Sequence, residues 1–183
     1  GNDLGFATQQ AQVSVKEHEY EIVYMAGDEN VTERMEAKSF TYSKGLASLA
    51  TCDLENGTHV EKWYTDSELT NEITSIASGR TEGITLYGKV VYNDYVIIFN
   101  GNGADGEMQN INAKYGSKVT LTANAFDYGN FRFVGWMLRA DGTEAVYTDG
   151  AEVENLVKTQ NGTITLYALW EMQIWNINYV MPE

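Results

Sequence analysis

Ile84-Thr-Leu-Tyr87 is repeated 80 positions later as Ile164-Thr-Leu-Tyr167. An alternating aromatic run stands upstream of each stretch, first as Tyr20-Glu-Ile-Val-Tyr24 and then as Tyr95-Val-Ile-Ile-Phe99. Self-similarity at so long a period is the mark of a small folded unit that has been copied in tandem. The sequence therefore predicts two units of roughly 75 residues each, close to the size at which a single core is only marginally stabilising.

The repeat divides the 183 residues into four segments. We predict a lead-in over residues 1–19, a first repeat over 20–93 and a second over 94–171. Residues 172–183 are predicted to be the first strand of a truncated third repeat, because Trp175-Asn-Ile-Asn-Tyr179 opens the pattern once more. The joints are only two or three residues long, and linkers that short leave little freedom between neighbours.

The hydrophobic pattern favours strands. Tyr20, Ile22 and Tyr24 share one face at period two, as a half-buried strand requires. One segment departs from this pattern, because residues 67–76 can form a short helix that ends at Gly79. The fold class predicted is α+β and mainly β. The residues expected in the two cores are Ile22, Tyr24, Phe40, Trp63, Ile84, Leu86, Tyr87, Ile97, Phe99, Leu121, Phe133, Trp136, Ile164, Leu166 and Tyr167.

Composition excludes several classes of function. The net charge of −14 would repel phosphate backbones, so nucleic-acid binding is not expected, and anionic membrane surfaces are disfavoured for the same reason. No stretch is long and apolar enough to span a bilayer. Residues 1–10 lack the basic start and apolar run of a signal peptide. The single cysteine, Cys52, excludes a disulfide framework within a monomer.

The second copy carries a fuller motif than the first. Phe133-Val-Gly-Trp136 is followed by the turn Asp141-Gly142, then by Tyr147-Thr-Asp-Gly150 and the closing run Thr165-Leu-Tyr-Ala-Leu-Trp170. These residues resemble the Listeria–Bacteroides repeat, also called the internalin B-repeat type. The first copy departs from the motif at two positions, since Lys62 stands where Gly precedes Trp and Val90 stands where the closing Trp would be.

The resemblance implies a β-grasp-like unit that is small and mainly β, with one short helix or helical turn. It also implies a secreted or surface-attached bacterial protein built from strings of such repeats, which act as stalks or as contact modules for host or matrix components. The resemblance brings no catalytic residues and no cofactor. The predicted fold is therefore two tandem β-grasp-like repeats with a partial third, and the predicted location is extracellular or on the bacterial cell surface.

The aromatic residues have two interpretations. Trp63, Trp136 and Trp170, with Tyr87 and Tyr167, offer area for stacking against sugar rings. They also recur at matching repeat positions on apolar faces at period two, which favours a core role. Aromatic residues outside the cores remain candidates for ligand contact. These are Tyr42, Tyr64, Tyr128 and Trp175.

The polar motifs favour structural interpretations. Residues 100–107, Asn-Gly-Asn-Gly-Ala-Asp-Gly-Glu, lack EF-hand spacing because Ala104 falls where a ligand should stand, so a Gly-rich turn is expected there. Cys52 and His59 form a conceivable nucleophile and base, but the second copy has no such pair. No metal ligand set is indicated, because the only histidines, His18 and His59, have no zinc-like spacing.

Two hypotheses about function follow. The first is a non-enzymatic extracellular repeat module of a bacterial surface protein, acting as a semi-rigid spacer or as an adhesion and protein-interaction module. The alternative is a carbohydrate-binding module that uses exposed aromatic residues. The expected partners are a host or matrix protein or a glycan. An unpaired strand over 175–180 is also expected to favour self-association through its edge.

Overall fold

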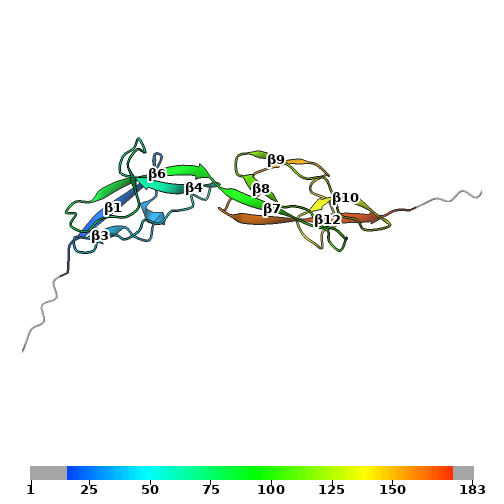
Figure 1. The fold of residues 1–183 in the computed structure, drawn as a ribbon, viewed down its shortest axis with the longest axis horizontal. Helices are drawn as coiled ribbons and strands as arrows, with labels where there is room; N and C mark the ends of the chain where they lie inside the picture. Colours follow the sequence, from blue (N-terminus) through cyan, green and yellow to red (C-terminus); the bar gives the residue numbers. More distant parts are fainter. Residues whose placement is uncertain (1–15, 175–183) are drawn as a thin grey trace, which may run out of the picture. The chain divides into compact units, whose positions relative to one another are not determined.

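The computed structural model describes residues 16–174, which form two compact units (Figure 1). Within these residues the first unit comprises residues 16–50 and 63–87, and the second comprises residues 51–62 and 88–174. The segment 51–62 lies inside the first sequence repeat, yet it folds as part of the second unit. The boundary between structural units is therefore not the boundary between sequence repeats.

Strands of the first copy form one sheet in the order β2-β1-β6-β4-β5, and β3 pairs with β1 beside this path. A single 3-10 turn, η1 (Thr32–Arg34), follows β2. The strands are β1 (Glu19–Ala26), β2 (Glu29–Asn30), β3 (Ser39–Thr41), β4 (Thr58–Tyr64), β5 (Glu72–Ile73) and β6 (Ile84–Tyr92).

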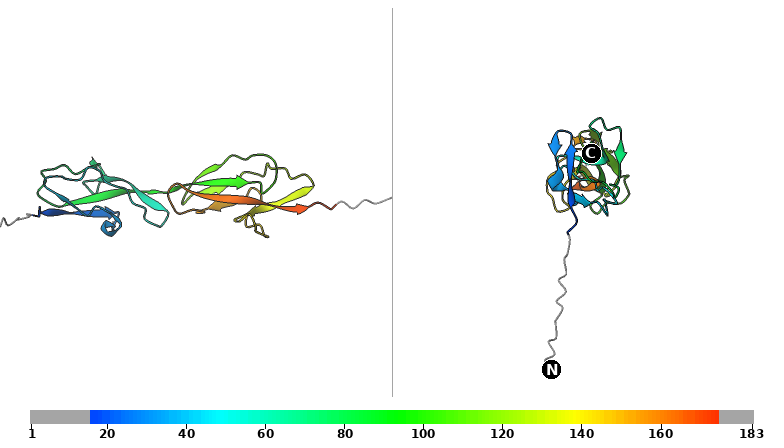
Figure 2. Two further views of the ribbon diagram at one scale, coloured as in Figure 1. Left: turned by 90° about the horizontal axis from the view of Figure 1, so that it is seen from below. Right: turned by 90° about the vertical axis from the view of Figure 1, so that its left-hand side faces the viewer.

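Strands of the second copy form a sheet in the order β10-β12-β7-β8 and a separate pair, β9 with β11. The two central strands, β7 and β12, are parallel and lie side by side in both Figure 1 and the left view of Figure 2. The edge strands β8 and β10 are antiparallel to their neighbours. The strands are β7 (Asp94–Asn100), β8 (Ile111–Lys114), β9 (Lys118–Thr120), β10 (Phe131–Met137), β11 (Glu152–Glu154) and β12 (Gly162–Met172).

The two copies share one strand order. In each, the aromatic opening strand, β1 or β7, lies between the short second strand and the closing strand, β6 or β12. The strand that carries the repeated Trp, β4 or β10, lies on the other side of the closing strand. The repeated sequence pattern therefore specifies a repeated strand order, and the prediction of a mainly β fold is confirmed.

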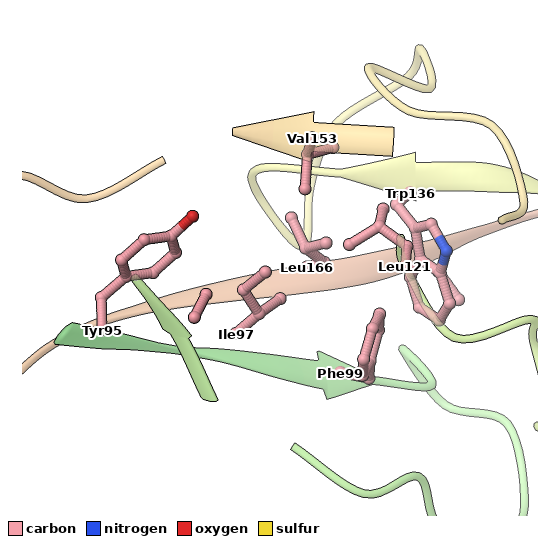
Figure 3. Close-up of a cluster of buried hydrophobic side chains, with 9 residues drawn as sticks. Tyr95, Ile97, Phe99, Leu121, Trp136, Val153 and Leu166 are labelled. Carbon is pink, nitrogen blue, oxygen red and sulfur yellow. The ribbon is translucent and has the colours of Figure 1, made fainter. Parts of the chain in front are cut away.

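The core of the second unit lies on one face of its sheet. Tyr95, Ile97 and Phe99 project from the same side of β7 because side chains alternate along a strand, and Figure 3 shows them facing Leu166 and Trp136. Phe99 and Trp136 are in ring contact, with their centroids 4.8 Å apart. The pair β9–β11 covers this face through residues such as Val153. Burial of these large apolar side chains is the main stabilising term of so small a unit.

Eleven of the fifteen predicted core residues are buried, but four are only half-buried. Tyr87 and Tyr167 directly follow the buried Leu86 and Leu166, so the alternation of the strand turns their rings to the opposite face of the sheet. The prediction was wrong to place both members of each Leu-Tyr pair in the core. The other two half-buried residues, which pack against the core of the second unit, are Phe133 and Ile164.

The helix predicted over residues 67–76 is wrong. This segment contains the short strand β5, which pairs with β4, and Leu69 has a positive φ of 54°. The carboxylate of Asp66 accepts hydrogen bonds from the backbone N–H groups of Thr70 (3.0 Å) and Asn71 (2.8 Å). Such side-chain bonds offer the backbone an alternative to helical bonding, and here they close a turn instead of opening a helix.

Parts of the predicted domain division lie outside the described residues. Most of the lead-in and most of the truncated third repeat, with its strand at 175–180, fall in residues 1–15 and 175–183. The division into segments 1–19, 20–93, 94–171 and 172–183 stays a prediction.

Candidate functional site

The aromatic residues predicted to contact a ligand do not come from one element. Tyr42, which is 52% exposed, follows β3, while the half-buried Tyr64 ends β4, and both belong to the first unit. Tyr128, which is 37% exposed, belongs to the second unit. Trp175 lies outside the described residues. The prediction that these residues contact a ligand stays a prediction.

Tyr128 is the member of this set with the richest aromatic surroundings. Its ring stacks on Phe131, with centroids 4.7 Å apart and an interplanar angle of 24°. It also meets Trp170 edge-on at 5.6 Å, and Trp170 in turn meets Phe133 at 5.5 Å. The indole N–H of Trp170 donates to the carbonyl oxygen of Gly101 at 2.8 Å. These contacts fix the Tyr128 ring with part of its surface exposed, which is the geometry that a sugar-stacking residue needs.

Asn93 is the buried polar residue of the described part of the chain, with no measurable exposure. Its backbone N–H donates to the carbonyl of Gly57 (2.9 Å), and its carbonyl accepts from the N–H of Tyr115 (2.8 Å). Its side-chain oxygen lies 2.7 Å from Nδ1 of His59, and its side-chain N–H donates to the carbonyl of Lys158. Both backbone groups and both side-chain polar atoms are therefore bonded, as burial of an amide requires.

Close packing accompanies these hydrogen bonds. Gly57 has φ +85°, and a Cβ atom built on it would lie 2.2 Å from a ring carbon of Tyr115. Only glycine satisfies both conditions, since L residues rarely adopt this conformation and any side chain would overlap the ring. Tyr115 and Gly57 thus form a specific contact within the second unit. The sequence analysis placed residue 93 at the end of the first repeat, at a joint of only two or three residues, and did not predict this cluster.

The Gly-rich stretch 100–107 connects the antiparallel strands β7 and β8, so it is the predicted turn region. Asn102 takes a positive φ of 53°, and its amide donates to the carbonyl oxygens of Ala140 and Ala168, each at 3.1 Å. Asp105 bridges Asp127 through the backbone. The asparagine side chains here bond to the protein backbone, which is a structural use of the motif.

The pair Cys52 and His59 is engaged in structure. The carbonyl of Cys52 accepts from the N–H of Val60, and His59 uses Nδ1 in its contact with Asn93. Across residues 16–174, no group of three or more His, Cys, Asp or Glu side chains is arranged to hold a metal ion. The arrangement around His59 therefore supports the second unit.

The surface of the second unit has shallow concavities. One, of about 440 Å³, is lined by neighbouring stretches of β7 and β8 with the Lys114–Asp94 ion pair (2.7 Å) at its edge. Another, of about 310 Å³, lies beside the Gly-rich stretch and Phe126. In the part of the chain that the structure describes, no helix is long and apolar enough to cross a membrane.

Comparison with known proteins gives two curated relatives, both from Evansella cellulosilytica. One, named "Putative Gly-rich membrane protein", is 31% identical over 119 residues, which are 64% of this chain and 12% of the relative. The other, named "Putative membrane protein", is 30% identical over 117 residues, which are 64% of this chain and 16% of the relative. The matches therefore span less than one fifth of each relative. No solved structure matches the chain.

The model of the Listeria–Bacteroides repeat domain matches twice, over residues 20–89 and 95–169. The two matches coincide with the two copies of the strand order, and the short stretch between them contains Asn93. The motif residues Gly135 and Trp136 lie on β10, where a Cβ atom on Gly135 would come within 2.6 Å of the Tyr147 carbonyl. The chain belongs to the Listeria–Bacteroides repeat family, as its sequence motifs predicted.

Proposed function

We propose that this chain is a non-catalytic, extracellular repeat module of a bacterial surface protein and that its first role is that of a semi-rigid spacer. The family assignment and the names of the two relatives support a place in a larger surface-associated protein. A module of this kind holds other parts of a long protein apart, so it needs ordered joints more than it needs a ligand pocket.

The observation that carries the proposal is the environment of Asn93. This residue lies between the two matched repeats, where a flexible connection would be polar and exposed. Instead it is fully buried and hydrogen-bonded through both backbone groups and its side chain. Buried and satisfied polar groups specify one arrangement, because each alternative would leave some of them unpaired. These contacts all lie within the second unit, so they order the stretch between the matched repeats there, and an ordered stretch of this kind supports a spacer role.

A binding screen tests the spacer role against an adhesive one. The chain would be tested at physiological salt against arrayed glycans and extracellular matrix proteins, together with generic glycosidase and esterase substrates. We expect no binding that survives added salt, since an acidic surface alone gives weak contacts that salt screens, and we expect no turnover. A reproducible, salt-resistant hit would instead make the module a recognition element.

Carbohydrate binding is the second candidate, and the exposed ring of Tyr128 is the observation that favours it. Its stacking on Phe131 and its contact with Trp170 hold one aromatic surface in place without further ordering cost. If a sugar stacks there, Trp fluorescence should change on titration with the glycan, because Trp170 lies beside the ring. Tyr128→Ala should abolish that change, and Tyr92→Ala, at an exposed tyrosine outside the set of predicted contact residues, serves as the matched control.

A further inference from the structure

A hollow of about 330 Å³ lies beside the opening strand β1 of the first unit, and we call it the Tyr24 hollow. It is lined by Tyr24, Met35, Glu36, Ala37, Leu46, Ser48 and Ala50. Tyr24 and Met35 are only 1% and 5% exposed, so they form its floor, whereas the exposed Glu36 and Ser48 lie at its rim. Ligand pockets usually measure about 300–1,000 Å³, so this hollow suits a small group such as one side chain.

The loop that forms one wall of the hollow has one residue more than its counterpart in the second copy. Leu46 and Leu49, three positions apart, donate their backbone N–H groups to the facing stretch 74–76. In the second copy, Val119 and Leu121 make the corresponding contacts with β11 and the residue before it, and these two are only two positions apart. Leu121 is 1% exposed in the core, whereas Leu49 is half-buried. The longer loop therefore seals the first core less completely.

The hydroxyl of Tyr24 is the polar group on the floor of the hollow. It bonds to no group of residues 16–174, and unlike the hydroxyl of Tyr95 it is not sealed from solvent. Burial raises the pKa of the Tyr24 hydroxyl above its ordinary value of 10.0, so near neutral pH it keeps its proton and can both donate and accept. This hydroxyl is therefore available to a group that enters the hollow.

Packing of the strand does not require that hydroxyl. The ring of Tyr24 meets the repeated Trp of its own copy, Trp63, with centroids 4.9 Å apart. In the second copy Phe99 takes the same place and meets Trp136 at 4.8 Å. A phenylalanine ring thus makes the equivalent core contact, and the additional oxygen belongs to the first copy alone.

Glu36 gives the rim of the hollow a negative charge. Its carboxylate has no ion-pair partner among the described residues, whereas the nearby Glu33 pairs with Lys38. The whole chain carries a net charge of −14, which attracts cations toward such a rim. A ligand that complements the hollow therefore combines an apolar body, a polar atom at its deep end and a positive charge near the entrance.

We propose that the Tyr24 hollow binds a tyrosine side chain that is flanked by positive charge, in a basic segment of a partner protein. The entering ring packs against Met35 and Leu46, and its hydroxyl bonds to that of Tyr24. The flanking cation pairs with Glu36. A buried tyrosine hydroxyl usually needs a hydrogen-bond partner, and tyrosine is enriched at protein interfaces. Of the apolar side chains, tyrosine therefore matches the floor best.

This inference goes beyond the spacer role and is compatible with it. One anchored side chain binds weakly, with a dissociation constant on the order of 1 mM, because few atoms make the contact. Its charged part weakens further as salt is added. Such a contact does not produce the salt-resistant hit that would contradict the spacer, so the two proposals can fail separately.

The test is an NMR titration of the whole chain with three blocked tripeptides, Lys-Tyr-Lys, Lys-Phe-Lys and Glu-Tyr-Glu, at low salt. The indole N–H of Trp63 is the reporter, because it donates to the carbonyl of Ala50 in the wall at 2.8 Å and its ring touches Tyr24. We expect a saturable shift with Lys-Tyr-Lys and an affinity about three- to tenfold lower for Lys-Phe-Lys, which lacks one hydrogen bond. Glu-Tyr-Glu should not bind.

Three variants assign the contributions within the hollow. Tyr24→Phe should bind the Tyr and Phe peptides equally, and its fold should persist because Phe stands at the equivalent position 99. Glu36→Gln should weaken both peptides and reduce the salt dependence of binding. Glu82→Gln removes an exposed carboxylate of the same unit that does not line the hollow, so it should leave binding unchanged.

Several results would overturn the proposal. One is the absence of a saturable shift of the Trp63 indole with Lys-Tyr-Lys. Another is equal binding of the Tyr and Phe peptides by the wild type, or a preference for Tyr that persists in a folded Tyr24→Phe variant. A third is an equal loss in Glu36→Gln and Glu82→Gln, because the peptide would then bind the acidic surface in general. The last comparison stands even if Tyr24→Phe does not fold.

Discussion

Nδ1 of His59 lies 2.7 Å from Oδ1 of Asn93, a residue 34 positions later in the chain. His59 lies on β4 of the first sequence repeat, but residues 51–62 fold with the second unit, so this contact belongs to that unit. Neighbouring repeats of this chain therefore share structure across the sequence boundary. Replacing the residues that make this shared structure, or those that build a core, should therefore cause the largest losses in stability.

Replacing Asn93 by Ala should destabilise the second unit. The change leaves His59 and the carbonyl of Lys158 without their side-chain partner at a partly buried site, at a cost of up to about 1–3 kcal/mol for each unpaired group. Urea unfolding followed by Trp fluorescence would measure the loss. Asn112→Ala, an exposed asparagine on β8, is the control and should change the unfolding free energy by less than about 0.5 kcal/mol. Equal stability of the two variants would contradict the role given to Asn93.

Gly57→Ala should be destabilising mainly through the ring of Tyr115. The new Cβ would lie 2.2 Å from that ring, in addition to the strain of a positive φ. Gly27→Ala isolates the strain, because Gly27 has φ +59° and a Cβ atom added there would have no atom within 4 Å. Thermal or urea unfolding of both variants should show a clearly larger loss for Gly57, on the order of 1–3 kcal/mol beyond the control.

A double-mutant cycle checks the origin of that loss. If ring overlap is the cause, Gly57→Ala should cost less in a Tyr115→Ala background than in the wild type, with a coupling of about 0.5–3 kcal/mol. Additive losses would mean that the two residues do not interact in solution.

Trp136→Ala should cost about 3–5 kcal/mol, because the side chain is fully buried in the core of the second unit. It touches the rings of Phe99, Phe126 and Phe133. Trp136→Phe is the matched variant. It keeps a ring and removes an indole N–H that has no hydrogen-bond partner among the described residues, so it should cost less. An unshifted melting curve for Trp136→Ala would disprove the core assignment.

Asp66 should contribute stability that acid removes. The backbone N–H of Thr70, with further hydrogen bonds from Asn71, lowers the pKa of the Asp66 carboxyl below its ordinary value of 3.8. Because the folded pKa is the lower one, the contribution is fully present above that ordinary value and is lost as the pH falls through the folded pKa. The difference in unfolding free energy between wild type and Asp66→Ala should therefore be largest near neutral pH and shrink below about pH 4. If the difference stays constant from neutral pH into that acid range, the hydrogen bonds of the Asp66 carboxylate do not stabilise the turn.

The sequence predicted the repeated part of the fold well, and the reason is period-two alternation. Ile22 and Ile97 lie on equivalent opening strands, Leu86 and Leu166 on the closing strands, and all four are fully buried. The core prediction failed for Tyr87 and Tyr167, because alternation along a strand places them on the face opposite to the buried Leu86 and Leu166. The helix prediction for residues 67–76 also failed. The backbone N–H groups of Thr70 and Asn71 donate to the Asp66 carboxylate and form a turn in place of a helix.

Much less of the candidate site could be predicted from the sequence. A polar Asn between two strands is typical of an exposed turn, and nothing nearby in the sequence marks Asn93 as buried. Its partners lie at Gly57 and His59 on one side and at Tyr115 and Lys158 on the other, so only the tertiary fold brings them together. Tyr42, Tyr64 and Tyr128 were selected because they lie outside the predicted cores, and such a criterion cannot tell which exposed rings share a surface.

The central claim is that the connection between the repeats is ordered, as a spacer requires. Distances between spin labels at Glu61→Cys, on the first-repeat segment that folds with the second unit, and at the exposed Glu144→Cys, in a Cys52→Ser background, test it most directly. A variant with about six Gly and Ser residues inserted between Asn93 and Asp94 gives the flexible reference. The account predicts one narrow distance distribution for the uninterrupted chain and a broad one for the insertion. Equally broad distributions for both would contradict the spacer.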